Sequence, residues 1–204
     1  MNDALTQKIS DPSIYVYQWI ADLNSSDINR ISLSTKAILK NLKGNSNVFV
    51  IHTEALSASL VFKLHSFLLT NPIPESIIKS ISLCLFHIFT DPKLYKKVPK
   101  EYVQQIVVEI CVHYKTSEEK KFSAEFTNLM GQMIESVPLF TFSSLLLAIG
   151  ELNVKWIFIA LKFFDKCGEK IMLIGNSNNA ICKSLLLVDK FFVEELKQKR
   201  KYIS

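Results

Sequence analysis

The chain has 204 residues, of which 49% are hydrophobic and 21% charged, so it can bury a sizeable core and is expected to be globular rather than disordered. Only 5 glycines and 6 prolines are present, too few for the many turns of an all-β sandwich. The net charge of +5 is mild and its lysines are spread along the chain, a pattern that does not favour nucleic-acid binding.

Apolar residues recur every three to four positions through the first half of the chain, which predicts helices over 12–23, 26–43, 47–70 and 74–90. The stripe in the second of these is formed by Ile28, Ile31, Thr35, Ile38, Leu39 and Leu42. Ser26 is the expected N-cap of that helix, because its hydroxyl can accept a hydrogen bond from the free amides of the first turn. Apart from the few residues around Val48 to Ile51, no stretch alternates with the period of two that a strand requires, so no sheet is predicted.

The same spacing continues in the second half and predicts helices over 99–115, 118–136, 138–150, 153–167 and 177–199. Its clearest stripe consists of Val103, Ile106, Val107, Ile110, Cys111 and Tyr114. These offsets place all six side chains on one face of a helix. The sequence therefore predicts an all-α protein.

The predicted helices group into antiparallel pairs near 12–43, 47–90, 99–136, 138–167 and 168–199, within one domain that spans residues 1–204. Successive pairs begin about 35 to 50 residues apart, a spacing typical of HEAT or armadillo repeats. A single pair cannot bury both of its faces, so neighbouring pairs are expected to stack into an α-solenoid. A globular helical bundle is the structural alternative.

No pattern of catalytic or ligand-binding residues is recognisable. The cysteines lie far apart without the spacing of a zinc site, and are expected to be buried free thiols: Cys84, Cys111, Cys167 and Cys182. The histidines each sit singly within apolar runs: His52, His65, His87 and His113. The glycines form no phosphate-binding loop. No catalytic residue, metal or cofactor is therefore predicted, and the chain is not expected to be an enzyme.

Targeting and membrane signals are equally weak. The chain begins Met1-Asn2-Asp3, without the basic and apolar segments of a signal peptide. The longest uncharged run, 136–150, is too short to cross a bilayer. A cytoplasmic protein that does not bind membranes is predicted.

Three stretches resemble a known family. Residues 19–29, which read Trp-Ile-Ala-Asp-Leu-Asn-Ser-Ser-Asp-Ile-Asn, are similar to the opening of the cryptic TOG-like domain near the C-terminus of the Mini spindles/TOG family of microtubule polymerases. The end of the third helix at 63–67, with Cys84 in the fourth, follows the helix order of that domain, and the Leu-rich segment 181–189 resembles its late helix. The resemblance covers about residues 13 to 195.

The resemblance implies a flat HEAT-repeat paddle in a cytoplasmic protein of the spindle, centrosome or microtubule ends, with tubulin or spindle proteins as partners. The chain itself is expected to be monomeric. The family's tubulin-gripping domains carry a tryptophan at the turn of the first helix pair. Here that turn is Asn24-Ser25-Ser26, and both Trp19 and Trp156 fall within predicted helices. Tubulin binding by the family's usual edge is therefore not implied.

Contacts with partner proteins are predicted at the helix-pair turns, because loops vary while the stacked core fixes their positions. The candidate protein-binding residues are Asn24, Ser25, Asp27, Asn71, Tyr95, Lys96, Lys97 and Lys115. Among them, Tyr95 is expected in an exposed loop between lysines that could meet an acidic partner. Two other functions stay open: a general helical-repeat adaptor in trafficking or signalling, and a helical enzyme with Cys111 or Cys182 as its nucleophile.

Overall fold

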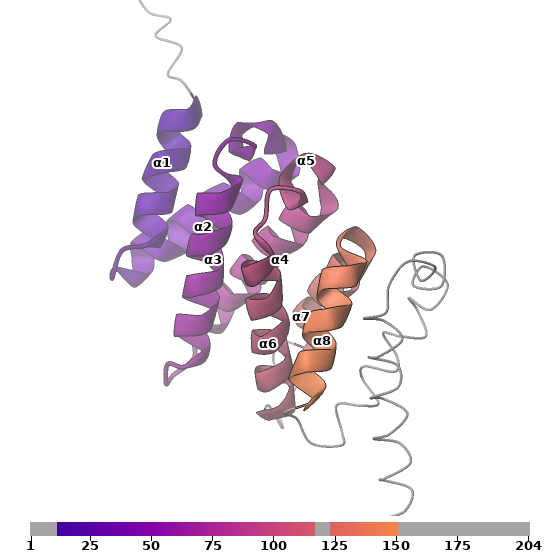
Figure 1. Ribbon diagram of the computed structural model, residues 1–204. Helices are drawn as coiled ribbons and strands as arrows, with labels where there is room; N and C mark the ends of the chain where they lie inside the picture. Colours follow the sequence, from indigo (N-terminus) through magenta and orange to yellow (C-terminus); the bar gives the residue numbers. More distant parts are fainter. Residues whose placement is uncertain (1–11, 117–122, 151–204) are drawn as a thin grey trace, which may run out of the picture.

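The computed structural model describes residues 12–116 and 123–150, and these residues form helices without any strand (Figure 1). The elements in chain order are α1 (Pro12–Leu23), α2 (Ile28–Gly44), the 3-10 helix η1 (Ser46–Phe49), α3 (Thr53–Leu68), α4 (Glu75–Thr90), α5 (Pro92–Tyr95), α6 (Lys100–Thr116), α7 (Ser123–Ser136) and α8 (Pro138–Gly150). The prediction of an all-α protein is confirmed for this part of the chain.

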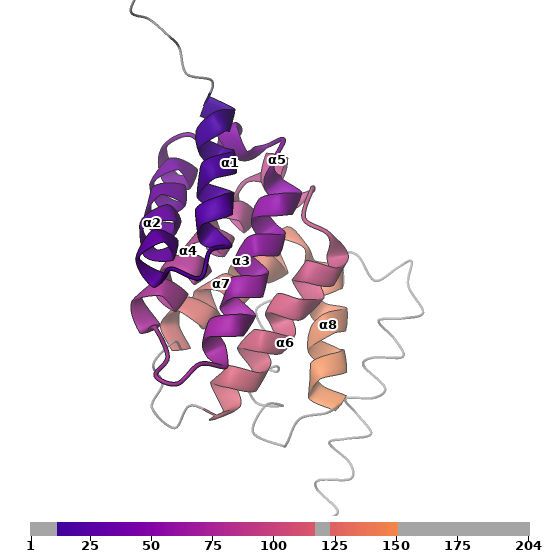
Figure 2. The ribbon, with the colours of Figure 1, turned by 90° about the vertical axis from the view of Figure 1, so that its left-hand side faces the viewer.

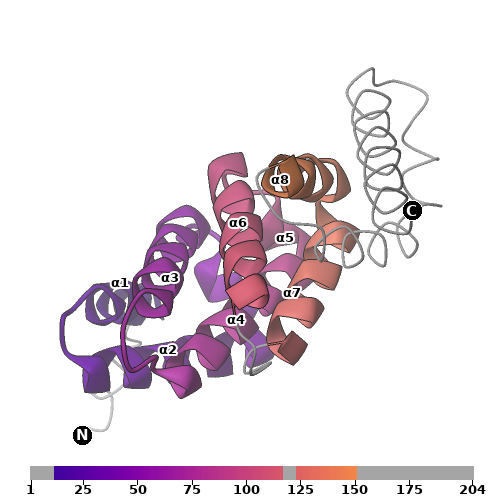
Figure 3. The same cartoon turned by 90° about the horizontal axis from the view of Figure 1, so that it is seen from below.

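The long helices lie in two layers (Figure 3). One layer contains α1, α3, α6 and α8 in that order, and each of these helices contacts the next. The other contains α2, α4 and α7, which also contact one another in order. Helices of one layer run in the same direction, and the two layers run in opposite directions (Figures 1 and 2).

Most of the predicted helix bounds agree with the structure to within about two residues, as expected from the fraying of helix ends. The helix predicted over 47–70 is wrong in its first part, because η1 occupies 46–49 and α3 begins only at Thr53. Phe49 explains the break: its side chain is fully buried, with its ring centroid 6.1 Å from that of Trp19. The chain turns there to insert Phe49 into the core. The helices predicted beyond residue 150 lie outside the described residues.

The core is densest around α4, which contacts helices of both layers: α2, α3 and α7. Its inward face consists of side chains that are at most 5% exposed: Ile77, Ile78, Ile81, Cys84, Leu85, Ile88 and Phe89. Burying a large apolar side chain of this kind stabilises a fold by about 1.5–3 kcal/mol. Of the stripe predicted in α2, Ile31, Thr35, Ile38 and Leu42 are buried as expected, whereas Ile28 is 50% exposed.

The N-cap of α2 is Asp27 rather than the predicted Ser26. Asp27 has extended backbone angles, with φ of −81° and ψ of 112°. Its Oδ1 accepts hydrogen bonds from the backbone amides of Asn29, at 2.8 Å, and Arg30, at 3.4 Å. Ser26 and Asp27 both have side chains that can cap a helix. Because the helix begins at Ile28, Asp27 is the residue at the cap position.

Replacing Asp27 by alanine is expected to lower the free energy of unfolding by about 1 kcal/mol, because two first-turn amides lose their acceptor. Asp27→Ser keeps an acceptor and should lose only a fraction of this amount. Ser26→Ala is the matched control and should leave the stability unchanged. Urea denaturation followed by far-UV circular dichroism measures the three values. An equal loss of stability in Ser26→Ala would contradict the assignment of the cap to Asp27.

Candidate functional site

The structure separates the candidate contact residues between two ends of the helical layers (Figures 1 and 2). In both views the α1–α2 turn, the α3–α4 turn and the C-terminal end of α6 lie at the lower ends of their helices, stepping downward from α1 to α6, and we call this the turn edge. The turn edge carries Asn24, Ser25, Asp27, Asn71 and Lys115. The segment around α5 lies at the opposite, upper side and carries Tyr95, Lys96 and Lys97. The eight residues therefore do not form one surface.

The α1–α2 turn is held against α3 by polar contacts. The side-chain amide of Asn24 donates a hydrogen bond to Ser59 Oγ at 2.9 Å. The ammonium of Lys63, a buried residue of α3, donates to the backbone carbonyl of Ser25 at 2.9 Å. Burial lowers the pKa of Lys63 from its usual value. Two of the candidate residues thus fix the geometry of the turn, and their exposed atoms are presented on a rigid support.

The other candidates on the turn edge differ in their surroundings. Asn71 is exposed in the α3–α4 turn and precedes Pro72 through a cis peptide bond. Lys115 belongs to the last turn of α6. Arg30, near the start of α2, forms an ion pair with Asp22 across the α1–α2 turn. This ion pair joins the end of α1 to the start of α2.

Tyr95 does not lie in an exposed loop, which corrects the sequence prediction. It ends the single helical turn α5, and its half-buried ring packs against the core. The turn forms because Asp91 accepts a hydrogen bond from the Lys93 amide at 2.9 Å and Pro92 occupies the first helical position. The most exposed aromatic residues described are instead Tyr17 and Phe62, at 65% and 61%.

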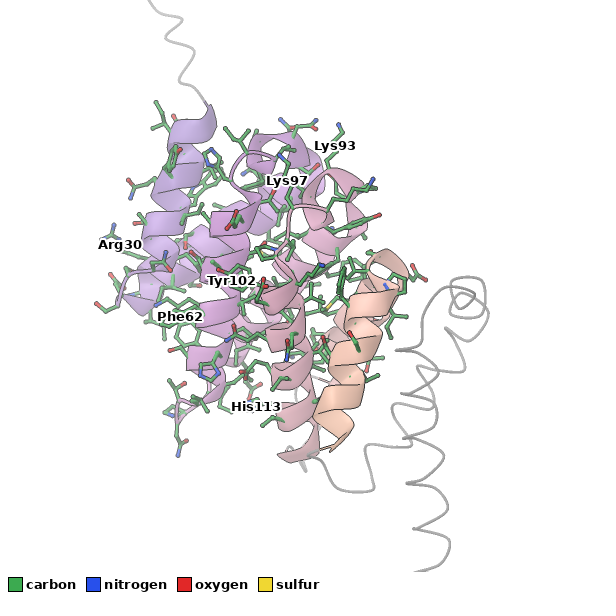
Figure 4. All side chains as sticks on the ribbon, viewed as in Figure 1. Arg30, Phe62, Lys93, Lys97, Tyr102 and His113 are labelled. Carbon is green, nitrogen blue, oxygen red and sulfur yellow. The ribbon has the colours of Figure 1, made fainter. Side chains whose placement is uncertain are left out.

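Lysines around α5 reach across to the segment that follows α2. Lys97 donates a hydrogen bond from Nζ to the carbonyl oxygen of Val50 at 2.8 Å. Lys93 donates to the side-chain oxygen of Asn47 at 2.9 Å. Figure 4 shows both lysines at the upper side, with His113 at the far end. Lys96 is exposed between them in sequence.

Two histidines that the sequence analysis treated as isolated come together around a buried carboxylate. Glu109 of α6 is 7% exposed. Its Oε1 lies 2.6 Å from His65 Nδ1 on α3, and its Oε2 lies 3.6 Å from His113 Nε2 one turn further along α6. At 2.6 Å the first pair hydrogen-bonds directly, which leaves no room for an ion between the two atoms. The cluster ties α3 to α6 and is a packing element that the sequence analysis missed.

Lowering the pH from about 7.5 to about 5.5 is expected to lower the melting temperature, since two histidines favour the neutral form in the fold. Burial lowers the pKa of His113, opposed by the charge of Glu109 and assisted by that of His65. Burial, assisted by Lys43, also lowers the pKa of His87. Depressed folded-state pKa values mean that this stability is present above the unfolded value of about 6.5 and is lost as pH falls.

The double variant His87→Gln/His113→Gln cannot gain these charges, so its melting temperature should fall less over the same pH range. Calorimetry at both pH values measures the two differences. Parallel pH profiles for the variant and the natural chain would contradict the assignment.

The two described cysteines are buried free thiols, as predicted: Cys84 and Cys111. Burial raises the pKa of Cys111 to about 12 and raises that of Cys84 further. Both thiols therefore stay protonated at neutral pH, and the thiol form is a poor nucleophile. Cys167 and Cys182 lie outside the described residues.

Within residues 12–116 and 123–150, no three side chains of histidine, cysteine, aspartate or glutamate are arranged to hold a metal ion. In the same ranges, no helix combines the length and apolar content that a bilayer crossing requires. Comparisons with known protein families, with curated proteins and with solved structures find no match to this chain.

Proposed function

We propose that this chain is a non-enzymatic helical-repeat scaffold that binds other proteins through its helix-pair turns. The setting we propose is the one implied by the resemblance of residues 19–29 to the TOG family, namely microtubules, the spindle or the centrosome. The partners would then be tubulin or spindle proteins. The setting depends on that resemblance alone, whereas the scaffold itself is supported by one observation, which is the order in which the helices pack.

That order supports a repeat architecture. In each layer, a helix packs against the corresponding helix of the next pair: α1 against α3 and α3 against α6, with α2 against α4 and α4 against α7 behind them. An α-solenoid is built in this way, because every pair buries its faces against the pairs before and after it. We therefore propose that α1–α2, α3–α4 and α6–α7 are successive HEAT-like repeats and that α8 begins a fourth.

The same packing supports the turn edge as a binding surface. Helices that run in the same direction within a layer bring the turns of successive pairs to one side of the molecule. A partner lying along that side can contact several turns at once, while the layers behind them keep the spacing fixed. Asn24, Asp27 and Asn71 are exposed there.

Binding to tubulin tests the proposed setting. The purified full chain should pellet with stabilised microtubules or shift free tubulin dimers in gel filtration. The variant Lys115→Glu reverses a charge on the turn edge and should weaken binding about fivefold, as expected for loss of one charge contact. Lys36→Glu makes the same change on an exposed residue of α2 away from both ends, so it is the matched control and should bind normally.

The outcomes separate the alternatives. Binding that is lost in Lys115→Glu and kept in Lys36→Glu supports the scaffold and its edge. Failure to bind microtubules and free tubulin would overturn the microtubule setting and leave a general adaptor in trafficking or signalling. Equal weakening in both variants would show that overall charge, rather than the turn edge, governs the interaction.

A further inference from the structure

Positive charge gathers at the end of the molecule opposite to the turn edge. The last turns of α2 carry Lys40 and Lys43, and the segment of α5 carries Lys93, Lys96 and Lys97; all five are exposed, and we call them the basic edge. The two groups lie side by side because α2 leads into η1, which contacts both α2 and α5. Ser46 Oγ joins them by donating a hydrogen bond to Asp91 Oδ2 at 2.5 Å.

Within the described residues, the charge of the basic edge is only partly offset by carboxylates. Among residues 12–116 and 123–150, none of its five lysines forms an ion pair. Asp91 is the carboxylate nearest in sequence to the lysines around α5, and its charge interacts favourably with that of Lys93, so it offsets part of this positive charge. Two other exposed carboxylates begin helices at this end, Glu54 of α3 and Glu101 of α6. Because the carboxylates at this end are fewer than the five lysines, an excess of positive charge remains.

Two of the three lysines around α5 also form hydrogen bonds within the fold. Nζ of Lys93 and Nζ of Lys97 are fixed by Asn47 and Val50. Leu94, which lies between them, is fully buried and anchors the helical turn. Side chains that are already ordered lose less entropy on binding, so a partner gains more from each contact.

We infer that the basic edge binds an acidic polypeptide segment. A lysine ammonium is a compact charge that can pair with a carboxylate at many angles. Nucleic-acid surfaces favour arginine and exposed aromatic rings on which bases stack. Here the five basic residues are all lysines, and the one aromatic residue of α5, Tyr95, packs against the core. An acidic peptide lying across α5 and the end of α2 fits this chemistry.

This inference goes beyond the proposed function, because the basic edge lies opposite to the turns on which that function depends. A scaffold with two such edges could hold two partners at once, one at each end. The two proposals can fail independently, since tubulin pelleting tests the turn edge and peptide binding tests the basic edge.

A fluorescein-labelled oligoglutamate peptide is the probe, and its fluorescence anisotropy with the full chain is the measurement. Binding is expected at low salt and should weaken steeply as salt is added, because exposed charges are screened. The triple variant Lys93→Gln/Lys96→Gln/Lys97→Gln should raise the Kd about tenfold, as expected when several modest surface charge contacts are removed together. Lys40→Gln/Lys43→Gln should raise the Kd severalfold while leaving the contacts of α5 intact.

The matched control removes the same number of charges from parts of α2, α4 and α6 away from the basic edge: Lys36→Gln/Lys79→Gln/Lys115→Gln, which should bind the peptide as the natural chain does. Thermal melts of all variants check that the fold is kept. The inference is overturned by equal loss in the control, by the absence of peptide binding at low salt, or by tighter binding of an oligothymidylate of equal length. The last result would assign the edge to nucleic acid.

Discussion

Truncating Phe89 to alanine should lower the free energy of unfolding by about 3–5 kcal/mol, the largest stability change that we expect from a single substitution. The ring is fully buried near the end of α4, where both layers meet. The backbone carbonyl of Phe89 is tied to α7 by hydrogen bonds from Ser136 Oγ and from Gln132 Nε2, the latter at 3.3 Å. Because the backbone is held in this way, it cannot move to fill the cavity that Phe89→Ala creates. The loss in the free energy of unfolding should therefore lie in the upper part of this range. Urea denaturation followed by circular dichroism measures it.

Phe62→Ala is the matched control, because it removes the same atoms from a ring that is 61% exposed on α3 (Figure 4). The free energy of unfolding of this variant should fall by less than about 1 kcal/mol, because the ring contributes little buried apolar surface. Similar losses in the two variants would mean that α4 does not occupy the centre of the fold.

The second large effect concerns thiol chemistry. In a Cys167→Ser/Cys182→Ser variant only Cys84 and Cys111 remain, and both should react with Ellman's reagent at least about a thousandfold more slowly in the folded than in the unfolded chain. The pKa of Cys111 rises from 9.0 to about 12, so its thiolate is about a thousandfold rarer at neutral pH. Burial also blocks access of the reagent, which slows the reaction further.

Unfolding in guanidinium restores both thiols and provides the reference rate. A fast-reacting thiol in the folded variant would contradict the burial of Cys84 and Cys111. Assigned to Cys111, it would support the alternative of an enzyme with that cysteine as its nucleophile. The same assay on the natural chain then shows how Cys167 and Cys182 react.

The helices could be predicted because their cause is local. A stripe such as Val103, Ile106 and Val107 needs only its own spacing to predict a buried face, and all three are buried. The break at Phe49 could not be predicted, because the run from 47 to 70 is apolar enough for one helix. Its interruption depends on how Phe49 packs against Trp19 from α1. Tertiary packing decided the local structure there.

The polar sites were harder to predict for the same reason. Glu109 and His113 are four residues apart on one helix, a spacing that places their side chains together and is readable from sequence. His65 is 44 residues from Glu109, and its contact exists only because α3 packs on α6. The hydrogen bonds of Asn24 and Ser25 to α3 likewise depend on the packing of one pair against the next.

The packing of each helix against those of adjacent pairs also bears on how the chain acquires its structure. The main partners of α1 are α2 and α3, and those of α8 are α6 and α7, so native contacts join segments that are near in sequence. Folds of low contact order form quickly and can grow from a local nucleus. If α1–α2, α3–α4 and α6–α7 are successive repeats as proposed, the first pair can pack during synthesis while later helices are still within the ribosome.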